Sequence, residues 1–101
     1  MKTNYELYLR AYDTHNPNAV RDQDFETVDF DPCVDYRDAV KRAKELSKNV
    51  PFKDCHGRCI QQVQIAAYYD GEEAEEEFGT SYYLIWRETY ENGKGTGRQY
   101  M

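Results

Sequence analysis

The chain has 101 residues and a formal net charge of −6 at pH 7, a length that suits one domain with one modest core. The negative charge works against bulk binding to DNA, RNA or anionic lipid, because long-range repulsion opposes each of them. Ten tyrosines and one tryptophan exclude a typical disordered acidic chain, since such chains are poor in aromatic residues.

The N-terminal half of the chain predicts two strands followed by a helix. Residues 4–12 alternate between apolar and polar side chains, which is the period of a half-buried strand. Residues 25–31 are a second, shorter and more acidic strand candidate. A helix is expected to start at Asp31 or Asp35 and to run to about Asn49, because apolar residues recur there at helical spacing.

The C-terminal half predicts two further strands joined by an acidic connection. Residues 60–70 and 80–90 each alternate in the manner of a strand. The stretch 70–79 between them is bounded by Asp-Gly and Phe-Gly, which favours a loop at the end of a hairpin. Residues 93–101 carry three glycines in five residues and are expected to form a flexible tail on a single domain that spans 1–92.

This order of elements predicts the α+β class, with a four-stranded, mostly antiparallel sheet in β-β-α-β-β order and one helix packed on one face. The residues expected on the helix-covered face are Leu7, Leu9, Val28 or Phe30, Val63, Ile65, Leu84 and Trp86. A single helix covers only one side of such a sheet. The second side is therefore expected to be open or to be covered by another molecule.

Two acidic segments are candidate partner-binding surfaces. The first contains Asp70, Glu72, Glu73, Glu75, Glu76 and Glu77, followed by Phe78 as an apolar anchor, and the second contains Asp22, Asp24, Glu26 and Asp29 and continues with Asp31, Asp35 and Asp38. If both lay on one side of the protein, their carboxylates would imitate a phosphate backbone, which carries one charge per ~1.7 Å of duplex axis. The alternative is a solvated surface that keeps the protein in solution.

The open sheet face is a second candidate surface for a partner. The residues expected there are Tyr8, Arg10, Tyr12, Tyr68, Tyr83 and Arg87, together with Gln62 and Gln64. Aromatic and arginine side chains on a sheet can stack nucleic-acid bases, and they are also enriched at protein interfaces. The net charge favours a protein partner, a second copy of the chain included, over RNA. The alternative is an ordinary sheet surface with half-exposed tyrosines.

Three cysteines leave a metal site open as a minority hypothesis. Cys55 and Cys59 could bind zinc with Cys33 and a histidine such as His56, but the second paired cluster of a usual zinc site is missing. A disulfide is a further alternative, although an odd number of cysteines suits reduced thiols in a cytosol. The expected state is three unligated cysteines, with Cys59 facing the core, and no cofactor.

No catalytic signature occurs in the sequence. Gly-x-Ser-x-Gly, His-Glu-x-x-His and a phosphate-cradling glycine loop are all missing, so no enzymatic activity is expected. The first ten residues lack the apolar region of a secretory signal, and the longest apolar runs are too short to span a bilayer. A cytoplasmic location without membrane contact is therefore expected.

These observations favour a small acidic, non-enzymatic protein that binds another protein. The leading hypothesis is an inhibitor or regulator of a basic, nucleic-acid-binding target, without direct contact to nucleic acid. Anti-CRISPR and antirestriction proteins have this size and charge, so an anti-defence role is its most specific form, by analogy of composition. The alternatives are a self-associating structural protein that uses the tyrosine-rich face, for example as a homodimer, and a zinc-dependent regulatory module.

Overall fold

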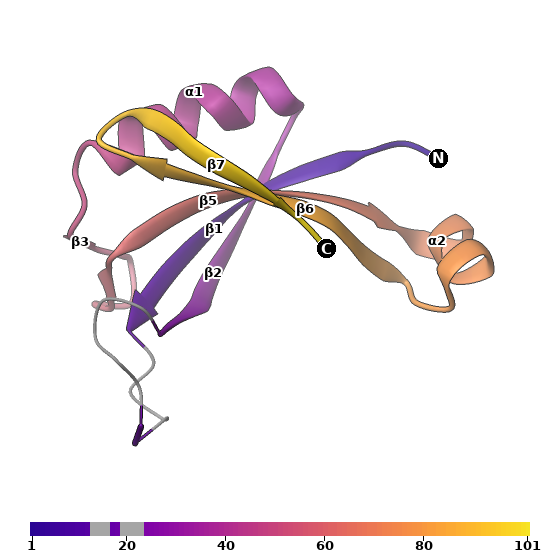
Figure 1. The fold of residues 1–101 in the computed structure, drawn as a ribbon, viewed down its shortest axis with the longest axis horizontal. Coiled ribbons are helices and arrows are strands. Elements are labelled where there is room, and N and C mark those ends of the chain that lie inside the picture. Colours follow the sequence, from indigo (N-terminus) through magenta and orange to yellow (C-terminus); the bar gives the residue numbers. More distant parts are fainter. Residues whose placement is uncertain (13–16, 19–23) are drawn as a thin grey trace.

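The computed structural model of the chain describes residues 1–12, 17–18 and 24–101. Within these residues, two strands, a helix, three strands, a second helix and two strands follow one another along the chain (Figure 1). The elements are β1 (Asn4–Tyr12), β2 (Phe25–Cys33), α1 (Tyr36–Ser47), β3 (Phe52–Lys53), β4 (Cys59–Ile60), β5 (Gln62–Asp70), α2 (Gly71–Phe78), β6 (Tyr82–Glu91) and β7 (Lys94–Tyr100). Neither helix in this part of the chain has the length and apolar character needed to cross a membrane.

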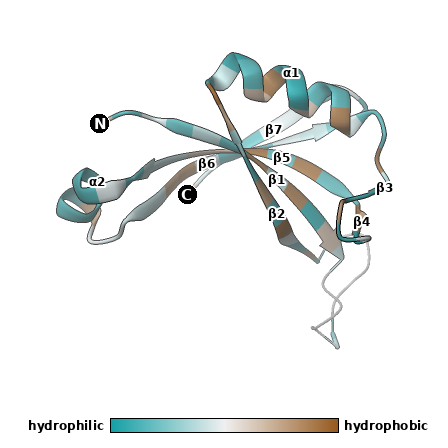
Figure 2. Cartoon of the chain, turned by 180° about the vertical axis from the view of Figure 1, so that it is seen from behind, coloured by the Kyte–Doolittle hydropathy of each residue, from teal (hydrophilic) through white to brown (hydrophobic). Residues whose placement is uncertain are grey.

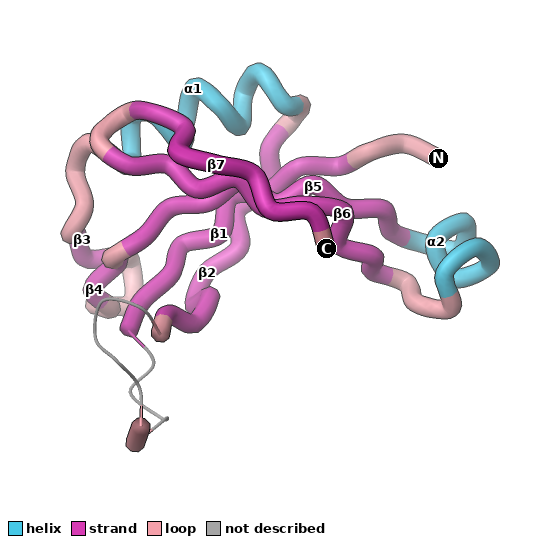
Figure 3. Tube along the Cα trace, viewed as in Figure 1, coloured by secondary structure: helices cyan, strands magenta, loops and turns pink. Residues whose placement is uncertain are grey.

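One antiparallel sheet has the strand order β2-β1-β5-β6-β7, and β3 pairs with β4 in a separate hairpin (Figure 3). The α+β class and the mostly antiparallel sheet predicted from the sequence are confirmed. The predicted four strands and one helix are wrong. In the described residues the acidic stretch forms the second helix α2, and the C-terminal segment adds β7 as a fifth strand of the sheet.

Helix α1 lies across one face of the sheet (Figure 2). Its N-cap is Asp35, one of the two predicted starts, whose carboxylate accepts a 2.8 Å hydrogen bond from the N–H of Asp38. Ala39 and Ala43 are fully buried, and their small side chains let α1 approach the sheet closely. The buried core around them contains Leu7, Leu9, Ile60, Val63, Ile65, Ala67, Trp86 and Tyr90.

An irregularity in the pairing of β5 with β6 changes which side chains share a face. Ala67 pairs with Trp86, but the next residue, Tyr68, pairs with Leu84, so β6 contains one extra residue at this point. Leu84 therefore lies on the opposite face from Trp86. The prediction that both side chains lie under the helix is wrong, because strict alternation does not anticipate a bulge.

The glycine-rich C-terminal segment forms a strand where a flexible tail was expected. Asn92 and Gly93 both have positive φ, 51° and 80°. Two such residues form the turn of a tight hairpin, and an Asn-Gly pair adopts it readily. β7 then pairs with β6. Its Arg98 guanidinium lies 3.8 Å from the ring centroid of Trp86, so a cation–π contact fastens the strand to the helix-covered face.

Glu88 joins β6, β7 and α1 through one carboxylate. It accepts hydrogen bonds from the hydroxyls of Tyr36 at 2.9 Å and Tyr90 at 2.7 Å, and it forms a 2.9 Å ion pair with Arg98. Burial raises the pKa of Glu88, but the hydrogen bonds from Tyr90, Tyr36 and Arg98 together outweigh burial and bring its pKa below the ordinary value.

Replacing Glu88 with glutamine is expected to lower the free energy of unfolding by about 1–3 kcal/mol at neutral pH, because hydrogen bonds to a charged group are worth about 1.5–3 kcal/mol. A carboxylate with a lowered folded-state pKa stabilises the protein above its unfolded pKa of about 4.3. This stabilisation is lost as the pH falls through the folded-state pKa, so wild type and variant should converge in acid.

Urea unfolding at about pH 7 and about pH 3 measures both effects. Glu45, which is exposed on α1, supplies the control, since Glu45→Gln should change the stability by less than about 0.5 kcal/mol. An equal loss for Glu88→Gln at both pH values would show that its charge is not what stabilises the hairpin.

Candidate binding surfaces

The acidic stretch 70–79 is a helix with defined ends, so its expected loop structure is wrong. Asp70 occupies the N-cap in an extended conformation, and glutamates in the first turn suit the positive end of the helix dipole. Gly79 has a φ of 75° and its N–H donates a 2.9 Å hydrogen bond to the carbonyl of Glu75. The two glycines that suggested loop ends therefore mark helix ends, as left-handed glycines commonly do.

An aromatic stack fastens α2 to the sheet. The Phe78 ring lies 3.9 Å from the ring of Tyr83 and 5.8 Å from that of Tyr69, nearly parallel to both, and Ala74 of α2 is fully buried. Phe78 is thus partly covered by the sheet and remains 39% exposed. Tyr83 pairs with Tyr69, on the opposite side of β5 from Tyr68, so the prediction that Tyr83 lies on the open face is wrong.

The carboxylates of α2 are exposed and poorly compensated. The exposed acidic residues of the helix are Glu72, Glu73, Glu75, Glu76 and Glu77. In the described part of the chain, the only ion pair to any of them joins Glu73 to the N-terminal amine at 3.9 Å, with the Glu73 side chain 74% exposed. Such a pair contributes little. Because α2 also lies beyond the end of the sheet (Figure 1), it projects a dense negative charge.

The second acidic segment does not continue this surface. Asp29 pairs with Leu9 of β1, which in turn pairs with Val63 of β5. Val63 precedes Asp70 by seven residues, or about 23 Å at ~3.3 Å per residue of strand. Glu26 lies still further from α2 along β2. Glu26 and Asp29 therefore do not lie beside the acidic residues of α2, as a continuous acidic surface would require.

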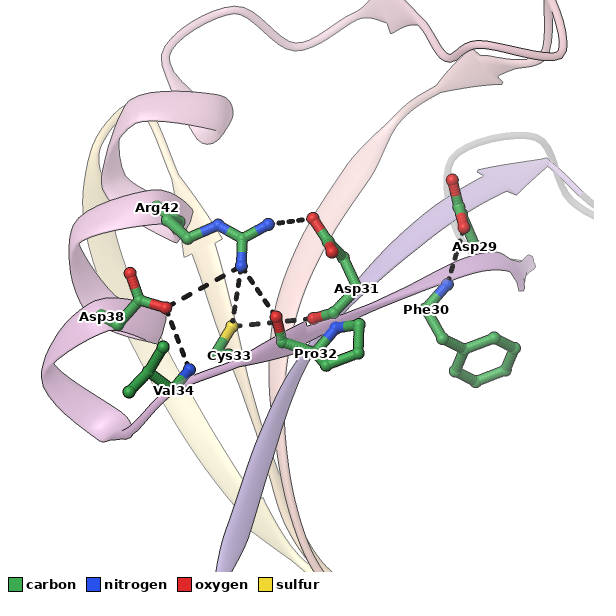
Figure 4. A network of polar contacts seen from close by, with 8 residues as sticks. All are labelled: Asp29, Phe30, Asp31, Pro32, Cys33, Val34, Asp38 and Arg42. Carbon is green, nitrogen blue, oxygen red and sulfur yellow. Dashed lines mark hydrogen bonds and ion pairs between the residues drawn. The ribbon is translucent and has the colours of Figure 1, made fainter.

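Other acids of the second segment are engaged with α1. Arg42 forms an ion pair with Asp31 and approaches Asp38 at 3.9 Å (Figure 4). The same guanidinium donates to the carbonyl of Pro32 at 2.9 Å. Asp24 directly precedes β2, and Asp22 lies outside the described residues. A structural role thus accounts for Asp31 and Asp38.

The sheet face opposite α1 carries most of the residues predicted for it. Strand alternation and register place Tyr8, Arg10, Tyr12, Gln62, Gln64, Tyr68 and Arg87 there, as predicted, and they add Glu6, Phe30, Tyr82, Leu84 and Thr89. No helix of the described residues covers this face (Figure 2). Phe30, one of two candidates for the core, is instead 55% exposed.

One half of the open face is an ordered aromatic shelf. The hydroxyl of Tyr82 donates to Glu6 at 2.7 Å and is also hydrogen-bonded to the hydroxyl of Tyr8. The Tyr68 ring stacks on Tyr82 at 4.7 Å, and Phe30 meets Tyr8 edge to face at 5.1 Å. Burial, together with these hydrogen bonds, raises the pKa of Tyr82, and burial raises the pKa of Glu6. The shelf is thus held in place by its own polar groups.

The other half of the open face holds two arginines. Arg10 donates to Oε1 of Gln64 at 3.2 Å, and Gln64 donates in turn to the hydroxyl of Thr89 at 3.0 Å. Burial lowers the pKa of Arg10, and the positive charge of Arg87 lowers it further. Neither arginine forms an ion pair with a carboxylate of the described residues.

The cysteines are separated along the sheet. Cys33 ends β2 near α1, whereas Cys55 and Cys59 are exposed in the β3–β4 hairpin at the far end (Figure 3). Cys59 does not face the core, because the neighbouring Ile60 occupies the fully buried position. Within the described residues, no group of three His, Cys, Asp or Glu side chains is placed to hold a metal ion, and His56 is exposed.

The arrangement therefore offers two surfaces to other molecules, the acidic helix α2 and the open sheet face with its shelf and its arginines. Both depend on the same ends of β5 and β6, because α2 packs on Tyr69 and Tyr83 whereas the shelf uses the adjacent Tyr68 and Tyr82 on the opposite face. The chain matches no model of a known protein family, no curated protein and no solved structure.

Proposed function

We propose that the chain is a non-enzymatic binding protein whose helix α2 docks into a basic groove of another protein, of the kind that otherwise holds nucleic acid. The observation that carries this proposal is the set of exposed glutamates on α2, which have no Lys or Arg side-chain partner among the described residues. Uncompensated charge on a fixed projection is a contact surface for a cationic partner.

The charge density of α2 supports the choice of partner. An eight-residue helix is about 12 Å long, so five carboxylates give one negative charge per ~2.4 Å of axis. Duplex DNA carries one charge per ~1.7 Å. A groove lined with Lys and Arg for a phosphate backbone would therefore meet a similar density of charge on α2.

The attachment of α2 supports fast and specific docking. The stacking of Phe78 against Tyr83 and Tyr69 holds the helix before any partner arrives, so little conformational entropy remains to be lost on binding. The carboxylates steer the encounter at long range. Because the second acidic segment lies elsewhere, the proposed contact involves α2 alone. An inhibitor that displaces nucleic acid, such as an anti-defence protein, is one biological form of this activity.

The experiment is affinity capture from a host lysate with the wild-type chain and two variants of equal net charge. The first variant changes Glu72, Glu73, Glu75 and Glu76 of α2 to glutamine. The control variant changes Glu26, Glu45 and Glu91 to glutamine and Asp29 to asparagine, all away from α2. Capture is compared at ionic strengths of about 0.01 M and 1 M, where the screening length is about 30 Å and 3 Å.

The proposal predicts that wild type and control capture the same basic, nucleic-acid-binding protein at low salt and that added duplex DNA releases it. The α2 variant should capture much less of it. Equal capture by all three chains, or a captured protein that DNA does not displace, would contradict the proposed function.

A further inference from the structure

Three buried side-chain atoms of the described residues have no hydrogen-bond partner, and all three belong to the open sheet face. They are Nε of Arg10, Oε1 of Gln62 and Nε of Arg87. Buried polar atoms without a partner are uncommon in folded proteins, and each calls for a physical explanation. The atoms themselves are covered by protein, but their concentration on one half of one face shows that two arginine side chains lie there without full pairing.

The register places the two arginines on either side of Gln64, on the same face. Gln64 of β5 pairs with Tyr8 on one side and with Thr89 on the other. Arg10 lies two residues beyond Tyr8 on β1, and Arg87 lies two residues before Thr89 on β6. Their long side chains reach toward Gln64 from opposite diagonals, and the hydrogen bond from Arg10 to Gln64 fixes one of them. Two like charges in a partly buried place repel each other, and an anion bound near both offsets that repulsion.

A cleft of about 420 Å³ opens beside Arg87, and Arg10 does not line it. Most of its lining is neutral donors and acceptors around one arginine, contributed by Gln62, Gln64, Arg87, Thr89, Gly97 and Gln99. Glu91 and Arg98 also line the cleft, and Arg98 is paired with Glu88. A side chain added at Gly97 would meet no atom within 4 Å, so the glycine of β7 leaves the cleft open above the sheet.

We propose that this half of the open face binds a phosphate group at Arg87, in the cleft, with the positive charge of Arg10 nearby. A guanidinium group binds oxyanions through paired hydrogen bonds. Arg10 contributes charge only, because its two terminal nitrogens already donate to Gln64 and to the carbonyl of Phe25. A phosphate that carries a proton also offers a hydroxyl donor, whereas a carboxylate offers acceptors only.

The site is independent of the proposed docking of α2. It uses β1, β5, β6 and β7 and none of the glutamates of the acidic helix. Two sources of the phosphate share this chemistry, the free ion and a phosphate ester such as a nucleotide. The aromatic shelf around Tyr8 lies next to Arg10 on the same face, so a nucleotide base would have a stacking surface within reach.

The test is a titration of the isotope-labelled full-length chain, followed by the resonances of Gln64, Arg87 and Thr89. The probes are inorganic phosphate, adenosine monophosphate, acetate and chloride at constant ionic strength. Saturable shifts with phosphate, and none with acetate or chloride, are expected. Tighter binding of adenosine monophosphate than of phosphate would identify a nucleotide as the source, and equal binding would identify the free ion. No saturable response to either phosphate probe would overturn the proposal.

Two arginine variants test the assignment. Arg87→Gln should weaken phosphate binding about tenfold or more, because it removes charge-assisted hydrogen bonds worth about 1.5–3 kcal/mol. Arg37→Gln removes the same charge from an exposed position on α1 and should leave binding unchanged. An equal loss in both variants would show that net charge, and no defined site, attracts the ion. The wild-type titration supports or overturns the proposal even if Arg87→Gln does not fold.

Discussion

Replacing Trp86 with alanine is expected to lower the free energy of unfolding by about 3–5 kcal/mol, the usual loss for a buried large aromatic side chain. Trp86 is 7% exposed and joins three elements. Its ring lies 6.1 Å from the ring of Tyr5 on β1, 5.8 Å from that of Tyr36 on α1, and beneath the Arg98 guanidinium of β7. A domain of this size has a total stability of only about 5–15 kcal/mol, so the variant should be close to unfolding.

Urea unfolding followed by far-ultraviolet circular dichroism measures this loss without the tryptophan signal. The control is Val34→Ala, because Val34 is 85% exposed and its truncation should change the stability by less than about 0.5 kcal/mol. A loss below about 1 kcal/mol for Trp86→Ala would mean that Trp86 does not hold α1 and β7 to the sheet.

The α2 variant with four glutamates changed to glutamine is expected to associate with the captured partner at least about tenfold more slowly at low salt, since electrostatic steering raises association rates by about 10–1,000-fold. The difference should shrink at about 1 M ionic strength, where the screening length is ~3 Å. We therefore expect a flatter dependence of the association rate on salt for the variant.

Stopped-flow mixing with the purified partner measures these rates. The four-charge control variant, which keeps α2 intact, separates local charge from net charge, and its rate should stay within about threefold of the wild-type rate. If the control slowed association as much as the α2 variant, the acidic helix would have no special part in the encounter.

The strands and the main helix could be predicted because their own residues carry the signal. Residues 4–12 alternate without interruption, and the structure has β1 over Asn4–Tyr12. Asp35 was one of two predicted helix starts, and it is the N-cap of α1. In both places, local propensity and burial favour the same structure.

Two of the missed elements, α2 and β7, have sequence signals that were interpreted as a loop and a tail. Glu and Ala are good helix formers, and Gly79 at the end of α2 is a helix cap, yet the flanking glycines suggested a loop. Asn92-Gly93 is a strong hairpin signal, but the glycines after it suggested a tail. Arg98 then holds β7 by contacts with Trp86 and Glu88 that lie far from it in the sequence.

The binding surfaces depend on register, which a single sequence does not fix. The bulge in β6 opposite Ala67 and Tyr68 moves Leu84 to the open face, and pairing across β1, β5 and β6 places Arg10 and Arg87 on opposite diagonals of Gln64. Residues that belong to different strands meet only once the strand order and the bulges are known.

The most direct test of the central claim is to map the partner's contact on the isotope-labelled chain by amide chemical shifts. We expect the largest changes on α2, at residues 71–79, with smaller changes at Tyr69 and Tyr83 beneath it. Changes concentrated on α1 or on the open sheet face, with α2 unaffected, would contradict the claim that the acidic helix is the docking surface.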